Sequence, residues 1–494
     1  MTDMKRAEYE TPPFFYYILL IFFATNSIIV VFCKLGVIIV TIQEFYKQIC
    51  GKTVAVCGIG KNNTPVVFLL LKHGVKVIAC DKRTRGELGE TAIELEKEGA
   101  VLQLGEQYLS QLNADIILRT PGMKPYLPEF EKARSEGKIV TSEMELFFDC
   151  CPVPIYSVTG SDGKTTTTTI IAGLLEKAGK TVHLGGNIGR ALLPVAEEIS
   201  AQDVAVAELS SFQLTRMQQS PHVAVVTNIA PNHLDWHTDM QEYIDAKKNL
   251  VRFQNKNDRA VLNADNEQTA AFAKDCSGEV WFFSRLKPVE RGTYLGKDGV
   301  LYGTDGATTT PILRANEINL PGVHNIENYL AAFAAVWGVV SVETMAEYAR
   351  TFGGVPHRCE LVRTLNQVKW YNDSIGSSPS RTIAGLKAFD RKVILIAGGY
   401  DKQISYKPLG PVAADTVKTA ILLGATAKAI ESAIRACSDL PIVHVANMQE
   451  AVKTAKELAK EGDIVFLSPA SASFDMYKNF EERGNHFKDL VNAL

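Results

Sequence analysis

The chain lacks the sequence features of two large protein classes. Its nine cysteines include no CxxC pair, so neither a disulfide framework nor a zinc knuckle is indicated, and they fit a reduced cytoplasm. It has no long run of Lys or Arg and a net charge of −3, so no nucleic-acid partner is expected. The rest of its 494 residues has a globular composition, 46% hydrophobic and 22% charged. A prior of roughly 150 residues per domain predicts about three domains.

One long stretch without charge stands near the N-terminus. Residues 14–33 are rich in Phe, Ile and Val and are long enough to span a membrane. If this segment is a real membrane anchor, a membrane is a partner of the protein. A signal peptide is disfavoured because the run is long and no small-residue cleavage site follows it. We favour a third interpretation, in which residues 1–45 are upstream sequence. The globular pattern begins near Gln43, and Val40 is a candidate initiator.

The most informative segment is 154–169, PIYSVTGSDGKTTTTT. A β-like run leads into a glycine-bounded loop, then a lysine and a train of hydroxyls. This order predicts a nucleoside triphosphate site, in which backbone N–H groups surround phosphate oxygens, the lysine reaches the outer phosphates and a threonine serves Mg²⁺. The spacing GxxGKT is shorter than the usual P-loop, and a Gly/Ser turn before a Thr-rich helix is the alternative. The predicted nucleotide-binding residues are Gly160, Ser161, Asp162, Gly163, Lys164, Thr165 and Thr166.

A Rossmann-like unit is predicted upstream of this loop. Residues 52–81 read as strand, tight turn, helix and strand. Gly58 and Gly60 begin a G-x-G-x-x-G pattern, but Asn63 stands in the place of the third glycine. The second strand ends in an acidic residue followed by two basic ones, which suits a ribose or uridine diphosphate as well as NAD. A structural βαβ turn is the alternative. The three residues are Asp81, Lys82 and Arg83.

The rest of the chain continues to alternate strands with helices, so a mostly parallel sheet is expected in 152–355 and another Rossmann-like fold in 356–494. Glu208 and His233 each follow an apolar run, and open α/β sheets gather ligands at strand ends. A carboxylate and an imidazole there suit a divalent cation that also binds phosphate. Taken singly, each is more often a hydrogen-bonded or solvated residue.

Ten motifs in order carry a family resemblance: TGSDGKT, GGNIG, ELSSFQL, NIAPNHLD, AKKN, GVHNIEN, VPHRCE, NDSIGSSP, GGYDK and SPASASFDMYKNFEERGNHF. From about residue 51 to the C-terminus the chain resembles the Mur ligases of bacterial cell-wall synthesis. The resemblance implies an α/β enzyme with a Rossmann-like domain for a UDP-linked substrate (46–151), a P-loop ATP-binding central domain (152–355) and a Rossmann-like domain for an amino acid (356–494). We expect a cytoplasmic monomer.

The implied reaction joins D-glutamate to the carboxylate of UDP-N-acetylmuramoyl-L-alanine through an acyl phosphate, at the expense of ATP and with two Mg²⁺ sites. Thr165 and Glu208 match residues that serve one Mg²⁺, and His233 matches a ligand of the other. Lys247 aligns with a lysine that similar enzymes carry as a carbamate, with Lys248 as its rival. The implied catalytic residues are Lys164, Glu208, His233 and Lys247.

The resemblance also implies contacts to ATP. Asn328 and Arg358 match positions that hold adenine and its surroundings, and Asp373 matches a residue near the ribose and phosphates. Ile375 departs from the pattern, because some members have a lysine there. A phosphate contact by that side chain is therefore absent.

Two further groups match substrate contacts. Asn187, Ser210 and Gln213 match polar contacts to the muramoyl substrate, although they could equally be turn and helix-cap groups. A lysine and a hydroxyl donor suit the two carboxylates of D-glutamate. The residues expected to hold D-glutamate are Lys402, Ser473 and Phe480.

Other functions remain alternatives at this point. The first unit alone is compatible with an NAD-dependent or nucleotide-sugar oxidoreductase, and the P-loop with a nucleotide-driven switch or a membrane-tethered binding module. A ligase for another amino acid, or an enzyme like folylpolyglutamate synthase, is nearer. If ATP and D-glutamate lie on different domains, the third domain must close on the second, and the VPHR segment is the expected hinge.

Overall fold

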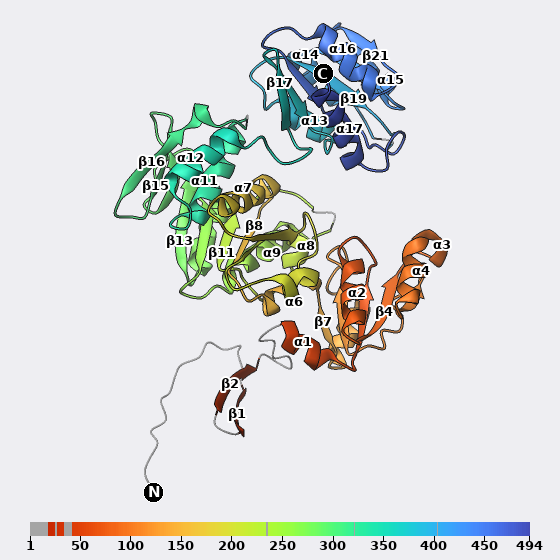
Figure 1. Ribbon diagram of the computed structural model, residues 1–494, viewed down its shortest axis with the longest axis vertical. Coiled ribbons are helices and arrows are strands. Elements are labelled where there is room, and N and C mark those ends of the chain that lie inside the picture. The colour runs from red at the N-terminus through yellow and green to blue at the C-terminus, as the bar shows by residue number, and fades with distance from the viewer. Residues whose placement is uncertain (1–17, 25–26, 34–41, 234–235, 321, 403) are drawn as a thin grey trace. The chain divides into compact units, whose positions relative to one another are not determined.

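The computed structural model of the protein describes residues 18–24, 27–33, 42–233, 236–320, 322–402 and 404–494 (Figure 1). These residues form two compact units. The first contains the described residues up to Pro154 together with Gly189–Asp203 and Met217–Gln219, and the second contains Ile155–Ile188, Val204–Arg216 and Ser220–Leu494. The three domain boundaries expected from the sequence stay predictions.

A five-stranded parallel sheet forms the centre of the first unit, in the order β5-β4-β3-β6-β7. Since β3 and β4 are neighbours, their carboxyl ends bring the Gly58 loop beside Asp81, and the predicted strand–helix–strand unit is confirmed. The strands are β3 (Thr53–Cys57), β4 (Lys76–Asp81), β5 (Val101–Leu104), β6 (Ile116–Arg119) and β7 (Ile139–Thr141), and the helices are α2 (Asn63–Lys72), α3 (Arg85–Leu88), α4 (Glu90–Lys97), α5 (Pro128–Ser135) and α6 (Glu143–Cys150).

A short amphipathic helix, α1 (Ile42–Ile49), precedes this sheet. It buries four side chains on one face, and its Tyr46 ring stacks on His73 with 3.6 Å between ring centroids. Within the apolar segment, β1 (Ile18–Ala24) and β2 (Ser27–Cys33) form an antiparallel pair, and its other residues lie outside the described part. No helix in the described ranges is long and apolar enough to cross a membrane.

The second unit begins with a nine-stranded sheet in the order β16-β15-β14-β13-β12-β11-β8-β10-β9. Its strands are parallel from β9 to β14 and antiparallel from β14 to β16, so the predicted mostly parallel sheet is confirmed. The strands are β8 (Ile155–Thr159), β9 (Val182–Gly186), β10 (Val204–Glu208), β11 (Val223–Val226), β12 (Arg259–Asn263), β13 (Glu279–Ser284), β14 (Gly292–Leu295), β15 (Val300–Thr304) and β16 (Thr309–Arg314).

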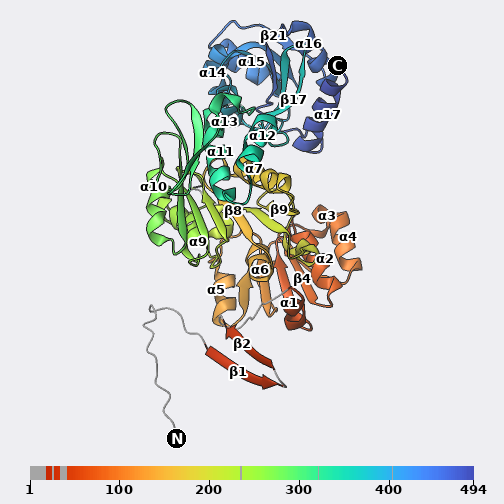
Figure 2. The same ribbon diagram turned by 60° about the vertical axis from the view of Figure 1, so that its left-hand side comes forward.

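Helices position the phosphate loop on this sheet. The helices α7 (Lys164–Lys177), α11 (Val323–Val336) and α12 (Val342–Thr351) share one apolar core with the strands, and α7 lies next to α11 in both ribbon views (Figure 2). The loop joins central strand β8 to α7. Because β10 is the neighbour of β8, Glu208 at its end comes close to the loop. The other helices here are α8 (Ser211–Leu214), α9 (Met240–Arg252) and α10 (Glu267–Ala271).

A six-stranded sheet follows in the order β17-β18-β22-β19-β20-β21, parallel except for β17. Alternate strand residues enter two separate cores, one with α13, α14 and α15 and the other with α16 and α17. This two-sided cover confirms an α/β layer architecture. The elements are β17 (Glu360–Leu365), β18 (Val368–Asn372), α13 (Pro379–Leu386), β19 (Val393–Gly398), α14 (Leu409–Thr416), β20 (Val417–Leu423), α15 (Ala427–Arg435), β21 (Ile442–His444), α16 (Met448–Leu458), β22 (Ile464–Leu467) and α17 (Phe480–Asn492).

Candidate active site

The loop between β8 and α7 begins and ends with a glycine, and the backbone geometry at both positions requires glycine. Gly160 and Gly163 have φ angles of +152° and +80°, which favour glycine. A Cβ atom on Gly160 would lie 1.8 Å from Thr227 Oγ1, and one on Gly163 would lie 2.4 Å from Asn328 Oδ1. The loop backbone is therefore pressed against its neighbours, and it leads directly into the N-terminus of α7. This is the geometry of a phosphate cradle.

Lys164, the first residue of α7, is bonded to the loop itself. Its Nζ donates to the carbonyl oxygens of Gly160 at 2.9 Å and Ser161 at 3.0 Å. Burial lowers the pKa of Lys164, although the carboxylates of Glu208 and Asp162 oppose the shift. The amine is thus positioned at the loop, within reach of phosphate groups that the loop would bind.

Thr227, Tyr243 and the carbonyl of Ala230, which were not predicted from the sequence, hold this loop in place. Thr227 Oγ1 donates to the Asp162 carbonyl at 2.6 Å, and Tyr243 Oη lies 2.9 Å from Ser161 Oγ. Ser161 Oγ also donates to the Ala230 carbonyl at 2.9 Å. A signal for Thr227 existed, since it follows the last residue of β11 and strand ends gather at one edge.

Glu208 is the last residue of β10, with 1% of its surface exposed. Its Oε1 accepts a hydrogen bond from Asn187 Nδ2 at 2.6 Å, and its Oε2 is buried with no hydrogen-bond partner. A buried carboxylate oxygen in this condition is costly unless a cation satisfies it. The site therefore suits Mg²⁺, with the Thr165 hydroxyl as a second candidate ligand on the first turn of α7. Asn187 orients the carboxylate.

His233 lies in the exposed loop after β11, in a left-handed backbone conformation with φ +55°. Its ring meets Phe212 edge-on with 4.9 Å between centroids, so the ring has a fixed neighbour on α8. Among the described residues no group of three His, Cys, Asp or Glu side chains could hold a metal ion. The residues predicted from the sequence to bind metal supply one carboxylate and one imidazole, and the Thr165 hydroxyl and Lys247 are the other members of that predicted set.

Lys247 on α9 is also brought to the loop, with only 1% of its surface exposed. Its Nζ donates to the Gly160 carbonyl at 2.8 Å and to Thr159 Oγ1 at 3.3 Å. Burial holds the pKa of Lys247 well below its usual value, and the nearby Lys164 lowers it further. Lys248 instead pairs with Asp275 at 3.3 Å. Of the two lysines that compete in the sequence, Lys247 is the one at the loop.

Of the residues expected around ATP, Asn328 and Asp373 are buried and hydrogen-bonded, whereas Arg358 is half-buried. Asn328 on α11 accepts a hydrogen bond from Thr167 Oγ1 at 3.2 Å and so connects its helix to α7.

Asp373 follows β18, and its carboxyl group accepts hydrogen bonds from Ser468 Oγ at 2.7 Å and from the Cys359 amide at 3.2 Å. Burial raises the pKa of Asp373 to about 7 against those hydrogen bonds. Burial also lowers the pKa of Arg358, and Arg381 adds to that shift.

The raised pKa of Asp373 predicts a pH-dependent stability. The folded protein keeps this proton up to about pH 7, whereas the unfolded chain loses it near pH 3.8, so ionisation destabilises the fold as the pH rises between these values. We expect the stability of wild type relative to Asp373→Asn to fall by about 3 kcal/mol from pH 5 to pH 8. Equilibrium denaturation measures the difference, and Asp390→Asn, an exposed carboxylate, is the control. A pH-independent difference would contradict the assignment.

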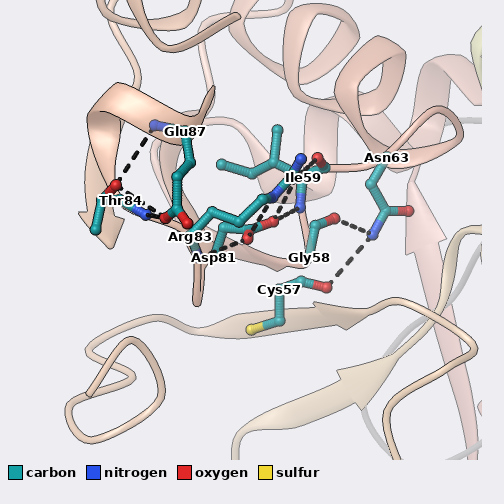
Figure 3. Close-up of polar contacts among 8 residues, drawn as sticks. All are labelled: Cys57, Gly58, Ile59, Asn63, Asp81, Arg83, Thr84 and Glu87. Atoms are coloured by element: carbon teal, nitrogen blue, oxygen red, sulfur yellow. Dashed lines mark hydrogen bonds and ion pairs between the residues drawn. The ribbon is translucent and has the colours of Figure 1, made fainter. Parts of the chain in front are cut away.

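In the first unit, Asp81 and Arg83 form a tight loop that faces the Gly58 turn (Figure 3). Asp81 accepts from the Ile59 amide at 2.8 Å and from Arg83 Nε at 2.9 Å, and Arg83 Nη2 donates to the Ile59 carbonyl. Burial would raise the pKa of Asp81, but the hydrogen bonds from Arg83 outweigh it and lower the pKa. Asn63 donates to the Gly58 carbonyl at 3.0 Å, so it fastens the turn where a third glycine was missing.

The remaining predicted residues lie at helix starts and in loops. Ser210 and Gln213 form a reciprocal capping box at α8, which confirms the helix-cap interpretation of this pair and leaves a substrate contact a prediction. Lys82 and Lys402 are exposed, whereas Ser473 is 3% exposed. Phe480 begins α17 and meets His357 edge-on at 5.9 Å.

Comparison with known proteins decides the family. Residues 158–336 match the Mur ligase middle domain, and residues 357–471 match the Mur ligase, glutamate ligase domain. The UDP-N-acetylmuramoylalanine--D-glutamate ligase of Acetivibrio thermocellus is 52% identical over 461 residues, which cover 92% of this chain and 99% of that protein. The chain belongs to the Mur ligase family. The ligase of the same name from Clostridium kluyveri is 49% identical over 458 residues, with the same two coverages.

Solved structures of Mur ligases support the fold. The UDP-N-acetylmuramate-alanine ligase of Thermotoga maritima covers 90% of this chain and 99% of its own, with a TM-score of 0.54 at 17% identity. A pseudomurein peptide ligase type C from Methanothermus fervidus has the same coverages, with a TM-score of 0.51 at 18% identity. As a Mur ligase, the chain is an ATP-dependent ligase, as predicted, and not an oxidoreductase or a P-loop switch.

Proposed function

We propose that this Mur ligase joins D-glutamate to UDP-N-acetylmuramoyl-L-alanine in the synthesis of peptidoglycan precursors. The relatives' names supply the substrates. The observation that carries the chemistry is that two lysines, the half-buried Lys164 and the buried Lys247, donate to the phosphate loop. The buried and partly unpaired carboxylate of Glu208 ends the neighbouring strand β10.

The reaction proceeds in two steps. An oxygen of the substrate carboxylate attacks the γ-phosphorus of ATP, so that ADP leaves and an acyl phosphate forms. The amine of D-glutamate then attacks the acyl carbon, loses a proton and displaces phosphate. Negative charge accumulates at the transferring phosphoryl group, and Lys164 at the loop is placed to neutralise it. Two Mg²⁺ ions would supply Lewis-acid stabilisation there, held by Thr165 and Glu208 and by His233 and a modified Lys247.

Lys247 is proposed to act as a carbamate. The ammonium group first loses a proton, and the neutral amine then adds to CO₂ and releases a second proton, so a cation is replaced by an anion that can bind metal. Burial favours the neutral form of this lysine at ordinary pH, since its pKa is strongly lowered. The same burial next to Lys164 makes an unmodified, charged Lys247 costly.

Substrate recognition is proposed to involve four groups of residues. The UDP part would lie at the Asp81–Arg83 loop and Lys82, and the muramoyl part near Asn187, Ser210 and Gln213. ATP would be held by the loop with Asn328, Arg358 and Asp373. Lys402, Ser473 and Phe480 would bind D-glutamate on the part beginning at residue 356, which would close by a hinge at 355–358. We propose that the enzyme works as a cytoplasmic monomer, with domains 46–151, 152–355 and 356–494.

The direct test is phosphate release with ATP, Mg²⁺ and UDP-N-acetylmuramoyl-L-alanine, comparing D-glutamate with L-glutamate, glycine, L-alanine and L-lysine. We expect release that depends on D-glutamate, in full-length protein and in protein that begins at Val40, because α1 and all later elements remain. Release with another amino acid only would replace the proposed substrate. Activity only in the full-length chain would assign the first residues a role in the enzyme.

The amino-acid site predicts a selective loss. We expect Lys402→Ala to raise KM for D-glutamate by about tenfold to a hundredfold, because a charge-assisted hydrogen bond to a carboxylate is lost, and to leave KM for ATP unchanged. Steady-state kinetics with each substrate varied measures both values. Lys407→Ala, an exposed lysine nearby, is the matched control. A larger effect on ATP than on D-glutamate would mean that the substrates have been placed wrongly.

A further inference from the structure

Arg381 is a cation that the fold places beside the proposed ATP residues and leaves unpaired. It lies in the first turn of α13, which contains no acidic residue. The side chain is exposed and makes no hydrogen bond or ion pair with the residues that the structure describes. A cation at a helix N-terminus is unfavourable for the helix dipole, so the helix itself does not explain this arginine.

Hydrogen bonds fix the start of α13 against Asp373. Ser468 Oγ donates to Asp373 Oδ2 at 2.7 Å and lies 2.9 Å from Oγ1 of Thr382, the residue after Arg381. A Cβ atom on Gly385, one turn further on, would lie 3.4 Å from Asp373 Oδ2. The helix backbone therefore passes directly beside this carboxyl group, and Arg381 is anchored through its neighbour.

A second arginine faces the same region. The Nε atom of Arg358 is buried and has no hydrogen-bond partner, although its neighbour Cys359 bonds Asp373 through its amide. Burial lowers the pKa of Arg358, and Arg381 is the next cause. Both arginines in turn stabilise the charged form of Asp373. Two guanidinium groups thus share one region, where the buried carboxyl groups of Glu208 and Asp373 only oppose the shift in the pKa of Arg358. A further anion would lower the free energy of this arrangement.

We infer that Arg381 binds the phosphate chain of the nucleotide, together with Arg358. This inference rests on the proposed function, in which Arg358 and Asp373 face ATP. Ile375 lies in the segment between Asp373 and α13 and offers no charge, so Arg381 supplies the cation from this side. Its planar fork can donate two parallel hydrogen bonds to one phosphate group, a geometry that an ammonium group does not present.

The test compares nucleotide binding by three full-length variants. We expect Arg381→Gln to weaken the binding of Mg·ATP by about tenfold to a hundredfold, in calorimetry without the other substrates, and to leave adenosine binding unchanged. Arg381→Lys should recover part of the affinity. Lys387→Gln, at the other end of α13, should bind like wild type. Because Arg381 is exposed, circular dichroism should show an intact fold in every variant.

Three results would overturn the inference: unchanged ATP affinity in Arg381→Gln, an equal loss for ATP and adenosine, or an equal loss in Lys387→Gln. The assay also separates this inference from the proposed function. If wild type binds Mg·ATP but releases no phosphate with D-glutamate, the proposed substrate is wrong, whereas the assignment of Arg381 is still decided by the binding data alone.

Discussion

Replacement of Lys164 by alanine should reduce phosphate release at least about a thousandfold. Removal of a positioned donor or cation from a phosphoryl-transfer site has effects of this size, because the lost charge stabilises the transition state more than the ground state. The Gly160 and Ser161 carbonyls that now accept from the amine remain in place, so the loop should still fold. Single-turnover phosphate release measures the chemical step, and calorimetry measures the remaining affinity for ATP.

A matched control for this variant lies on the same helix. Lys177→Ala removes an exposed lysine from the last turn of α7 and should leave both readouts at their wild-type values. If Lys164→Ala kept more than about a tenth of the wild-type rate, stabilisation of the outer phosphates would have to come from another group.

The second large effect is expected at Lys247. Lys247→Arg preserves a positive charge but cannot form the carbamate, and we expect at least about a hundredfold loss of phosphate release, since loss of even an outer partner of a metal ligand costs tenfold to a hundredfold. In wild type, depletion of CO₂ should lower activity, and added bicarbonate should restore it. Acidification should act in the same direction as depletion, because protonation of the amine removes the nucleophile.

The measurement pairs activity with a direct spectroscopic signature. Carbon NMR with labelled bicarbonate should show a carbamate signal in wild type and none in Lys247→Arg. Lys248→Arg, which keeps its charge near Asp275, should retain both the signal and the response to bicarbonate. A wild-type enzyme that is indifferent to CO₂, with no carbamate signal, would show that Lys247 works as a buried amine.

The sequence predicted the parts of this fold and site that depend on local pattern. Strands β3 and β8 follow from apolar runs that end at a glycine, and β4 follows from an apolar run that ends at Asp81. The position of Glu208 follows from its place at the end of such a run. The antiparallel edge from β14 to β16 was not predicted, because strand direction depends on how distant segments pair.

The roles of single polar side chains were harder to predict, because they depend on contacts between segments far apart in the chain. The substrate contact of Asn187 stays a prediction, and its hydrogen bond to Glu208, 21 residues away, was not predicted. Lys247 and Lys248 are neighbours in the sequence, and only tertiary packing turns one toward Gly160 and the other toward Asp275. Neither the Asn187–Glu208 hydrogen bond nor the different contacts of the two lysines can be predicted from the spacing of residues in the sequence.

The hydrogen bonds of Lys164 have a consequence for nucleotide selectivity. Its amine is already satisfied by two carbonyl acceptors within the loop, so a ligand must compete with the protein's own backbone for it. The charged outer phosphates of a triphosphate can displace these carbonyls, because charge-assisted hydrogen bonds are stronger than those to neutral carbonyl groups. A nucleoside or a monophosphate that does not reach the amine obtains no binding free energy from it. The loop with its internally bonded Lys164 therefore discriminates between triphosphates and shorter nucleotides by itself, without any movement of another part of the protein.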